Sequence, residues 1–115
     1  MIELTPVETV ACCSPLVQEP LSAQQADQIA PLLKAIADPV RLRLLSLVAS
    51  CAGQEACVCD LNDAFDLSQP TISHHLMVLH DAGLLDREKR GVWVFYKVRS
   101  EALEGLATLL SGVGA

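Results

Sequence analysis

The sequence predicts a mainly α-helical fold with a small β-hairpin, arranged as a winged helix-turn-helix that forms a homodimer. Hydrophobic residues recur at helical spacing in successive segments, and most of these segments begin with a helix-capping residue. Two strand-like runs joined by a short glycine-containing loop follow the fourth of these segments. A length of 115 residues suits one domain.

The first twenty residues differ from the rest of the chain. Pro6, Pro15 and Pro20 lie among acidic residues, a composition that argues against regular structure. We therefore expect residues 1–21 to form a flexible leader, and this leader carries the adjacent pair Cys12-Cys13. The expected DNA-binding and dimerisation domain covers residues 22–110, and residues 111–115 form a C-terminal tail.

Two capped helices are expected to open the domain. Ser22 and Gln25 have the spacing of a capping box, and hydrophobic residues then recur to about Ala37. Asp38 followed by Pro39 is typical of a helix start. This second helix is expected to end near Ala52-Gly53, and its predicted buried stripe consists of Val40, Leu44, Leu45, Leu47 and Val48.

A helix-turn-helix is predicted next. Cys57 occupies the place where such a motif usually has a serine or threonine cap, because Asp60 follows three residues later and a hydrophobic face begins at Leu61. Ser68 caps the following helix and Pro70 lies in its first turn. The predicted buried residues of that helix, which ends before Gly83, are Ile72, Leu76 and Leu79.

The wing and a last helix complete the domain. The strand-like runs cover residues 84–88 and 92–98, and Lys89-Arg90-Gly91 is the predicted loop between them. The last helix is expected to be amphipathic, with a hydrophobic face of Leu103, Leu106, Ala107 and Leu110. The wide hydrophobic faces of the first and last helices are expected to pair across a two-fold axis.

The distribution of charge favours a nucleic-acid partner although the net charge is −6. Between residues 86 and 99, five basic residues face two acidic ones, which makes a local basic patch. A recognition helix enters the major groove with its N-terminal half. The expected DNA contacts are Ser68 and Thr71 to phosphate, Gln69, Ser73 and His74 to base edges, and Lys89 and Arg90 at the wing tip.

Two thiol pairs are candidate ligands for a soft ion. The five cysteines lack the spacing of a secreted disulfide framework, so in a reducing compartment they are expected to be free thiols. Thiolates bind cadmium, lead, zinc, copper(I) and trivalent arsenic or antimony. A helix N-terminus lowers a thiol pKa, which favours the ion-binding thiolate at the cap residue Cys57 of the Cys57 and Cys59 pair. Burial as small core residues is the alternative for these two, and Cys51 is either a reserve ligand or a packing residue.

The stretches Cys57-Val58-Cys59-Asp60-Leu61 and Leu67-Ser68-Gln69-Pro70-Thr71-Ile72-Ser73-His74-His75-Leu76, followed by a basic hairpin, closely resemble the ArsR/SmtB family of winged-helix repressors. The resemblance implies a homodimer that sits on double-stranded operator DNA until an ion binds. In arsenic-sensing relatives a further cysteine follows the thiol motif, and here Asn62 stands in that place. In cadmium-sensing relatives, N-terminal thiols complete the site, which here gives that role to Cys12 and Cys13.

The expected inducer is trivalent arsenic or antimony. Adjacent Cys12 and Cys13 fit an open pyramid of sulfurs, which one further thiol from Cys57 or Cys59 would complete, better than a tetrahedral cage. The resemblance also implies that a second, zinc-type site of Asp and His residues can occur on the last helix, but it is not expected here because residues 99–110 contain no histidine or cysteine. The alternatives are a cadmium- or lead-sensing repressor and a thiol redox-sensing repressor. An enzyme is not expected, since no catalytic set stands out, and the chain is expected to be cytoplasmic with no membrane partner.

Overall fold

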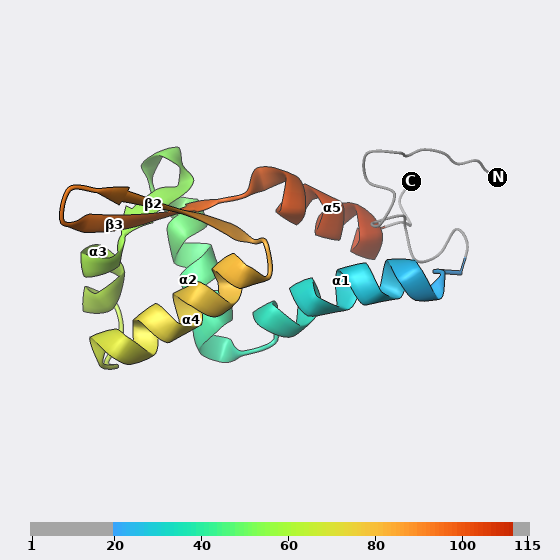
Figure 1. The fold of residues 1–115 in the computed structure, drawn as a ribbon, viewed down its shortest axis with the longest axis horizontal. Coiled ribbons are helices and arrows are strands. Elements are labelled where there is room, and N and C mark those ends of the chain that lie inside the picture. Colours follow the sequence, from blue (N-terminus) through green and yellow to red (C-terminus); the bar gives the residue numbers. More distant parts are fainter. Residues whose placement is uncertain (1–19, 112–115) are drawn as a thin grey trace. The chain divides into compact units, whose positions relative to one another are not determined.

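The computed structural model describes residues 20–111. The described chain divides into two compact units, one with residues 20–31 and 100–111 and the other with residues 32–99. The second unit contains the helix-turn-helix and the sheet (Figure 1). The predicted mainly helical winged fold is confirmed.

The first two helices begin where the capping residues predicted. Helix α1 spans Ala23–Ile36, and before it the Ser22 amide donates to Gln25 Oε1 at 2.9 Å while the Gln25 amide donates to Ser22 Oγ at 3.1 Å. Helix α2 spans Pro39–Ser50 with Asp38 as its cap. It buries Leu44, Leu45 and Val48, whereas the predicted core residues Val40 and Leu47 are half-buried.

Helix α2 ends earlier than predicted. Its last residue is Ser50, and a short 3-10 helix, η2 (Ala52–Gln54), follows. Gly53 has a φ of 70°, a left-handed conformation that glycine adopts without steric cost. This turn redirects the chain into a strand instead of extending the helix.

That strand, β1 (Glu55–Cys57), was not predicted. The sheet has three antiparallel strands in the order β1-β3-β2, with β2 at Leu85–Arg90 and β3 at Trp93–Val98. Three residues are too short to show strand periodicity. Strand β1 instead depends on its partner, because Glu55 pairs with Lys97 and Cys57 pairs with Phe95.

The turn of the wing is also displaced from its predicted position. Arg90 pairs with Trp93 across the two strands, so the turn consists of Gly91 and Val92 and not of Lys89-Arg90-Gly91. Gly91 has a φ of 65°, which suits the first position of a tight two-residue hairpin. Arg90 therefore belongs to strand β2.

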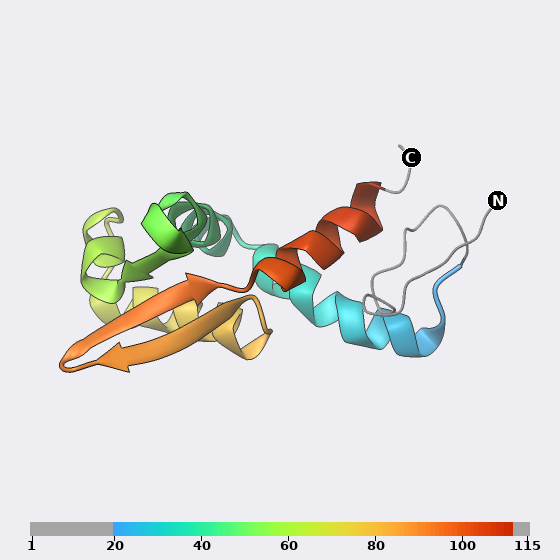
Figure 2. The ribbon, with the colours of Figure 1, turned by 90° about the horizontal axis from the view of Figure 1, so that it is seen from above.

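The core of the second unit holds the recognition helix in place. Helix α3 spans Val58–Asp63 and helix α4 spans Gln69–Asp81. In Figures 1 and 2, α3 and the tip of the β2–β3 hairpin lie toward the same end of this unit. The side chains with at most 1% exposure in this core are Leu44, Val48, Leu61, Ile72, Leu76, Leu79, Leu84 and Leu85.

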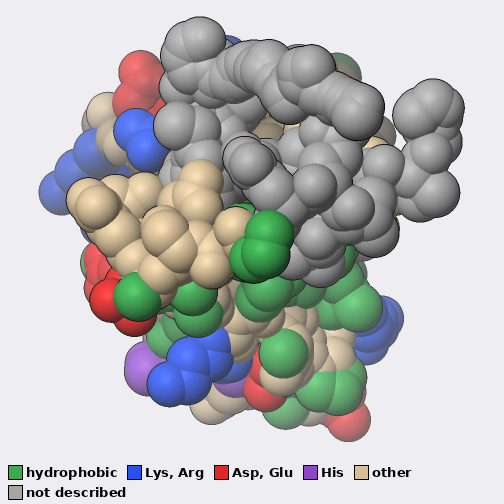
Figure 3. All heavy atoms as spheres, turned by 90° about the vertical axis from the view of Figure 1, so that its right-hand side faces the viewer, with side chains coloured by type: hydrophobic (Ala, Val, Ile, Leu, Met, Phe, Trp, Pro, Cys, Tyr) green, Lys and Arg blue, Asp and Glu red, His purple; other side chains and the backbone are tan. Residues whose placement is uncertain are grey.

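The last helix, α5, spans Ser100–Ser111 and belongs to the first unit. Its buried residues are Gly105, Leu106 and Leu109, whereas Leu110, expected on the buried face, is 60% exposed. Ala107 is exposed and Leu103 is half-buried, so the hydrophobic face is rotated from the predicted one. Hydrophobic side chains also remain at the surface, as Figure 3 shows in green. None of the described helices combines the length and hydrophobicity needed to cross a membrane.

Candidate thiol site and nucleic-acid interface

Two cysteines meet where the sheet passes into the helix-turn-helix. Cys57 is the last residue of β1 and the cap of α3, and its Sγ accepts from the Cys59 amide at 3.4 Å, so the predicted thiol cap is confirmed. The Sγ atoms of Cys57 and Cys59 are 2.6 Å apart. Cys57 is buried and Cys59 is exposed, so one thiol is fixed by the fold and the other faces solvent.

The electrostatics of Cys59 favour the protonated thiol. The hydrogen bond with Cys57 raises the pKa of the Cys59 thiol to about 11, and desolvation and the negative charge of Asp60 act in the same direction. An ion that binds here must displace the proton, as soft thiophilic ions do.

The other predicted ligands are not gathered around this pair. Cys51 caps the end of α2, and its Sγ donates to the Leu47 carbonyl at 3.2 Å. Within residues 20–111, no three His, Cys, Asp or Glu side chains lie close enough together to hold a metal ion. Cys12 and Cys13 lie outside the described residues. The described part of the chain thus offers two thiols, and a third ligand has to come from elsewhere.

The thiol pair opens into a pocket of about 270 Å³. The pocket lies among the start of α3, one side of α4 and the wing. Gln69 and Ser73, two of the residues predicted to read DNA bases, line it together with the thiols. The full lining comprises Cys57, Val58, Cys59, Gln69, Ser73, Met77, Arg87, Val92, Trp93, Val94 and Tyr96. The pocket was not predicted, because it depends on how α4 packs against the wing.

The N-terminal half of α4 has the organisation expected of a recognition helix. Ser68 caps it, since Ser68 Oγ accepts from the Thr71 amide at 3.3 Å and lies 2.9 Å from Thr71 Oγ1. Gln69, Thr71 and His74 are exposed and Ser73 is half-buried. All five predicted DNA contacts of this helix therefore lie within its cap and first two turns, where their polar groups are accessible in the single chain.

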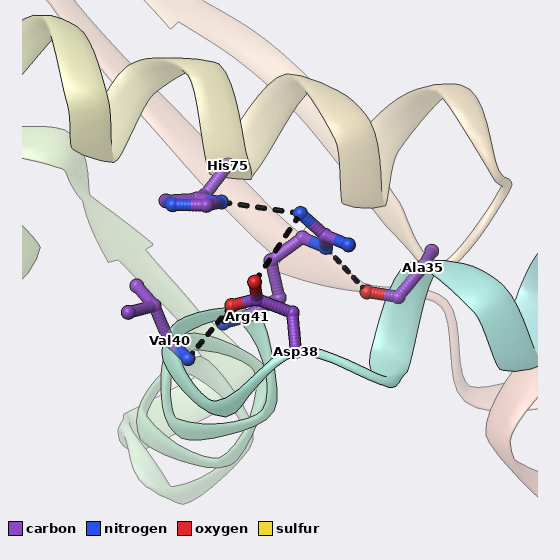
Figure 4. A network of polar contacts seen from close by, with 5 residues as sticks. All are labelled: Ala35, Asp38, Val40, Arg41 and His75. Carbon is purple, nitrogen blue, oxygen red and sulfur yellow. Dashed lines mark hydrogen bonds and ion pairs between the residues drawn. The ribbon is translucent and has the colours of Figure 1, made fainter.

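A second polar network connects α4 to the start of α2 (Figure 4). Arg41 Nε donates to the Ala35 carbonyl at 2.6 Å, and the Arg41 guanidinium lies 3.3 Å from His75 Nδ1. Asp38 Oδ1 accepts from the amides of Val40 and Arg41, and the hydrogen bond from Arg41 holds the pKa of this carboxyl below its usual value. This role of Arg41 was not predicted, because the hydrophobic pattern of the helix does not distinguish Arg41 from Arg43.

Some of the basic side chains of the wing form ion pairs and others do not. Arg90 Nη2 binds Glu55 Oε1 at 2.7 Å and Glu88 Oε1 at 2.8 Å, and its guanidinium lies over the Phe95 ring at 4.2 Å. The hydrogen bond from Arg90 lowers the pKa of Glu55. Arg99 binds Asp86 at 2.9 Å. Among the described residues, the basic side chains of the patch that form no ion pair are Arg87, Lys89 and Lys97.

Comparisons with known proteins agree with this architecture. Residues 38–87 match the family described as bacterial regulatory protein, arsR family. The arsenical resistance operon repressor of Bacillus subtilis is 38% identical over 64% of this chain and 68% of its own length. The arsenic resistance transcriptional regulator ArsR1 of Pseudomonas putida is 40% identical over 71% of this chain. The matched region spans 62% of the length of that relative, which is less than two thirds.

Solved structures show the same fold. A possible transcriptional regulator for arsenical resistance superimposes with a TM-score of 0.61 at 36% identity, over 66% of this chain and 76% of its own. A homodimeric winged helix-turn-helix DNA-binding domain from Mycobacterium bovis gives a TM-score of 0.63 at 26% identity, over 78% and 84% of the two chains. The chain therefore belongs to the ArsR family of winged helix-turn-helix transcriptional regulators, which are DNA-binding proteins and not enzymes.

Proposed function

We propose that this repressor binds operator DNA as a homodimer and releases it when trivalent arsenic or antimony binds Cys57 and Cys59 together with a thiol of the Cys12-Cys13 pair. The observation that supports this most strongly is the shared pocket, which is lined by Cys57 and Cys59 together with Gln69 and Ser73 of α4. An ion held there lies beside the side chains that we assign to base contacts. Ion binding and DNA binding then affect each other reciprocally.

Dimer formation is part of this proposal. The single chain exposes Leu33 and Leu110, on α1 and α5, the two helices whose hydrophobic faces the sequence predicted to pair. One solved relative is described as homodimeric. A two-fold dimer presents two recognition helices to successive major grooves, so its geometry sets the spacing of the two operator half-sites.

The proposed DNA contacts predict two different mutational effects. Gln69→Ala is expected to reduce the preference for operator over scrambled DNA, since removal of a base contact costs about 1–3 kcal/mol of discrimination. Lys89→Ala is expected to weaken binding to both sequences and to lower the magnitude of the salt slope by about 1, because one phosphate is no longer neutralised. Fluorescence anisotropy over a salt series measures both. Equal binding of operator and scrambled DNA by the unaltered protein would exclude a sequence-specific repressor.

Glu55→Gln is expected to strengthen binding to any DNA by about two- to fivefold, because it frees Arg90 from one of its two carboxylates. Since the pKa of Glu55 lies below its usual 4.5, the ion pair contributes to stability above that pH, and this contribution is lost as pH falls through the lowered pKa. In the Glu55→Gln variant, the free energy of unfolding is thus also expected to decrease less as the pH falls into the acid range. Arg90→Ala tests the wing contact in the opposite direction and is expected to weaken DNA binding in general.

The experiment that tests the inducer is a gel-shift titration of the dimer on operator DNA with arsenite, antimonite, cadmium, lead and zinc. Arsenite or antimonite is expected to release DNA at the lowest concentration, and X-ray absorption of the loaded dimer is expected to show three sulfur neighbours. Release by cadmium at a lower concentration, with four sulfur neighbours around the ion, would identify cadmium as the inducer. The proposal that the protein is an ion-responsive repressor would be unaffected.

A redox-sensing repressor is the second candidate, because the Cys57 and Cys59 sulfurs are close enough to react with each other once one is oxidised. The two candidates differ in their response to a reducing agent. Release by arsenite is expected to persist with a non-thiol phosphine reductant present, whereas release by an oxidant is reversed by it. Release that occurs only without reductant would favour the redox candidate.

A further inference from the structure

We propose that Arg41 positions the recognition helix α4 through a hydrogen bond to neutral His75, so that operator recognition weakens when His75 takes up a proton. This inference rests on the proposed function, since it takes the N-terminal half of α4 to read operator bases. It concerns a site separate from the thiols, because neither Arg41 nor His75 lines their pocket. Its consequence is a repressor whose sequence selectivity depends on pH.

Arg41 joins the last turn of α1 to α4, and all of these residues belong to the second unit. Its Nε donates to the Ala35 carbonyl at 2.6 Å, and its Nη1 lies 3.3 Å from His75 Nδ1, as Figure 4 shows. The two contacts use different nitrogens of one planar guanidinium, and the Arg41 side chain is only 18% exposed. A lysine ammonium, which is a single point of charge, cannot occupy both positions.

The hydrogen bond requires one protonation state of His75. A guanidinium has donors only, so His75 Nδ1 has to accept and therefore carries no proton. The ring is then neutral, with its proton on Nε2. A protonated ring has donors on both nitrogens and would face the Arg41 cation, so protonation breaks the bond. Histidine is the side chain that ordinarily changes charge between about pH 5 and 8.

The charged groups recorded around His75 in the described residues leave little to balance a second positive charge. They are Arg41 and Asp38 at the start of α2 and His74 on α4, whose ring centroid is 5.8 Å from that of His75. Asp38 is the negative group among them, and its carboxylate already accepts from the amides of Val40 and Arg41 as the cap of α2. The Arg41 amide lowers the pKa of this carboxyl, so Asp38 stays charged and engaged over the range in which histidines titrate.

The bond to His75 gives α4 a direction that hydrophobic packing lacks. The buried face of α4 holds the helix against the core, but hydrophobic burial is non-directional, whereas a hydrogen bond depends on angle. In the part of the chain that the structure describes, two side-chain hydrogen bonds join α4 to other elements, one at His75 and one at Met77. His75 directly follows His74, which we assign to a base contact. The Arg41 bond therefore fixes the rotation of the segment of α4 that presents base-reading side chains.

The protonation state can be tested on the free protein, without DNA. Nitrogen-15 NMR of the imidazole rings distinguishes a ring nitrogen that accepts a hydrogen bond from one that carries a proton. At about pH 7.5, His75 is expected to be neutral with its proton on Nε2. A proton on His75 Nδ1 at that pH, in either the neutral or the charged ring, would overturn the proposal, because Arg41 could not donate to it.

Arg41→Lys keeps the positive charge and removes the second contact. The ratio of operator affinity to scrambled-DNA affinity, measured by fluorescence anisotropy at about pH 7.5, is expected to fall by about tenfold or more with the salt slope unchanged. Arg43→Lys is the matched control, because it makes the same change on the same helix, where the exposed guanidinium lies 4.5 Å over the Phe65 ring. It is expected to leave the ratio unchanged. An equally unchanged ratio in Arg41→Lys would mean that only the charge matters and would overturn the positioning role.

A pH series tests the role of His75 and needs no substitution in its first step. In the unaltered protein, the operator-to-scrambled ratio is expected to fall by about tenfold between about pH 7.5 and 5.5. His75→Leu, which has no acceptor, is expected to show a low ratio at both pH values. His75→Asn, which offers an oxygen near the place of Nδ1 and takes up no proton, is expected to recover most of the ratio at both. His80→Asn removes another histidine of α4, one that contacts Asp81, and is expected to keep the pH response.

The outcomes distinguish this inference from the proposed function. A preference for operator DNA that does not change with pH, or a pH response that survives in His75→Asn, would overturn the positioning role and leave the proposed function intact. If the unaltered protein shows no preference for operator DNA while NMR shows the neutral Nε2–H ring, the proposed function fails and the positioning role fails with it. Circular dichroism checks the fold of each variant, and the pH series on the unaltered protein decides the matter if Arg41→Lys does not fold.

Discussion

Arsenite at saturation is expected to lower the operator affinity of the dimer by about thirty- to a thousandfold, which corresponds to a coupling free energy of roughly 2–4 kcal/mol. The Cys12→Ser/Cys13→Ser double variant is expected to lose this response and to keep its affinity for operator DNA. The reason is the number of ligands, since residues 20–111 place only two thiols together and arsenite needs three. Gel shifts with and without arsenite measure both quantities.

A gain-of-function variant makes this test sharper. Asn62 follows Cys59 by three residues in α3, so the two side chains lie on neighbouring positions of one helix face. Its Oδ1 atom is buried and has no hydrogen-bond partner, which means that its replacement breaks no hydrogen bond of that atom. Asn62→Cys in the double variant is expected to restore release by arsenite.

Asn62→Ser is the matched control, because it has nearly the size of cysteine but lacks the sulfur. It is expected to leave the double variant unresponsive. Arsenite release that survives unchanged in the double variant itself would exclude the leader as the source of the third ligand, and would return Cys51 to consideration despite its present bond to the Leu47 carbonyl.

The helix starts could be predicted because their determinants are local. Ser22 with Gln25, Asp38 with Pro39, and Ser68 with Pro70 each contact backbone within a few residues, so sequence spacing is sufficient to recognise them. The thiol cap at Cys57 followed from the same reasoning, since its position relative to Asp60 and Leu61 is that of a cap.

The features that were missed depend on contacts between distant residues. Strand β1 forms because Glu55 to Cys57 pair with β3, some forty residues later, and three residues carry no periodic signal of their own. The bond between Arg41 and His75 likewise joins residues 34 positions apart. The raised pKa of the Cys59 thiol could not be predicted for a related reason, because the distance between its sulfur and that of Cys57 cannot be read from spacing alone.

The pocket shows how function depends on such non-local packing. The sequence shows its thiols, its recognition-helix residues and its wing residues as separate motifs, and the packing of α4 against the β2–β3 hairpin brings them to one pocket. The helix-turn-helix and the wing are the elements that we propose to contact DNA, and Cys57 and Cys59 line a pocket together with residues of both. No long conformational pathway is required for an ion at this site to affect base contacts.

The packing that positions α4 makes Leu76→Ala the most destabilising substitution that we predict. Leu76 is 0% exposed, and with Ile72 and Leu79 it forms the face by which α4 packs into the core. Removing a fully buried leucine side chain leaves a cavity and typically costs about 2–5 kcal/mol, a large part of the roughly 5–15 kcal/mol that stabilises a domain of this size.

Urea denaturation at fixed protein concentration, followed by far-UV circular dichroism, is expected to show this loss of stability for Leu76→Ala, together with loss of operator binding at temperatures where the unaltered dimer binds. Leu42→Ala is the matched control, because it makes the same chemical change on a helix at a side chain that is 53% exposed, and it is expected to alter the free energy of unfolding by no more than about 0.5 kcal/mol. A cost below about 1 kcal/mol for Leu76→Ala would mean that α4 is not anchored through this face. The shared pocket, which requires α4 to be held against the wing, would then lose its structural basis.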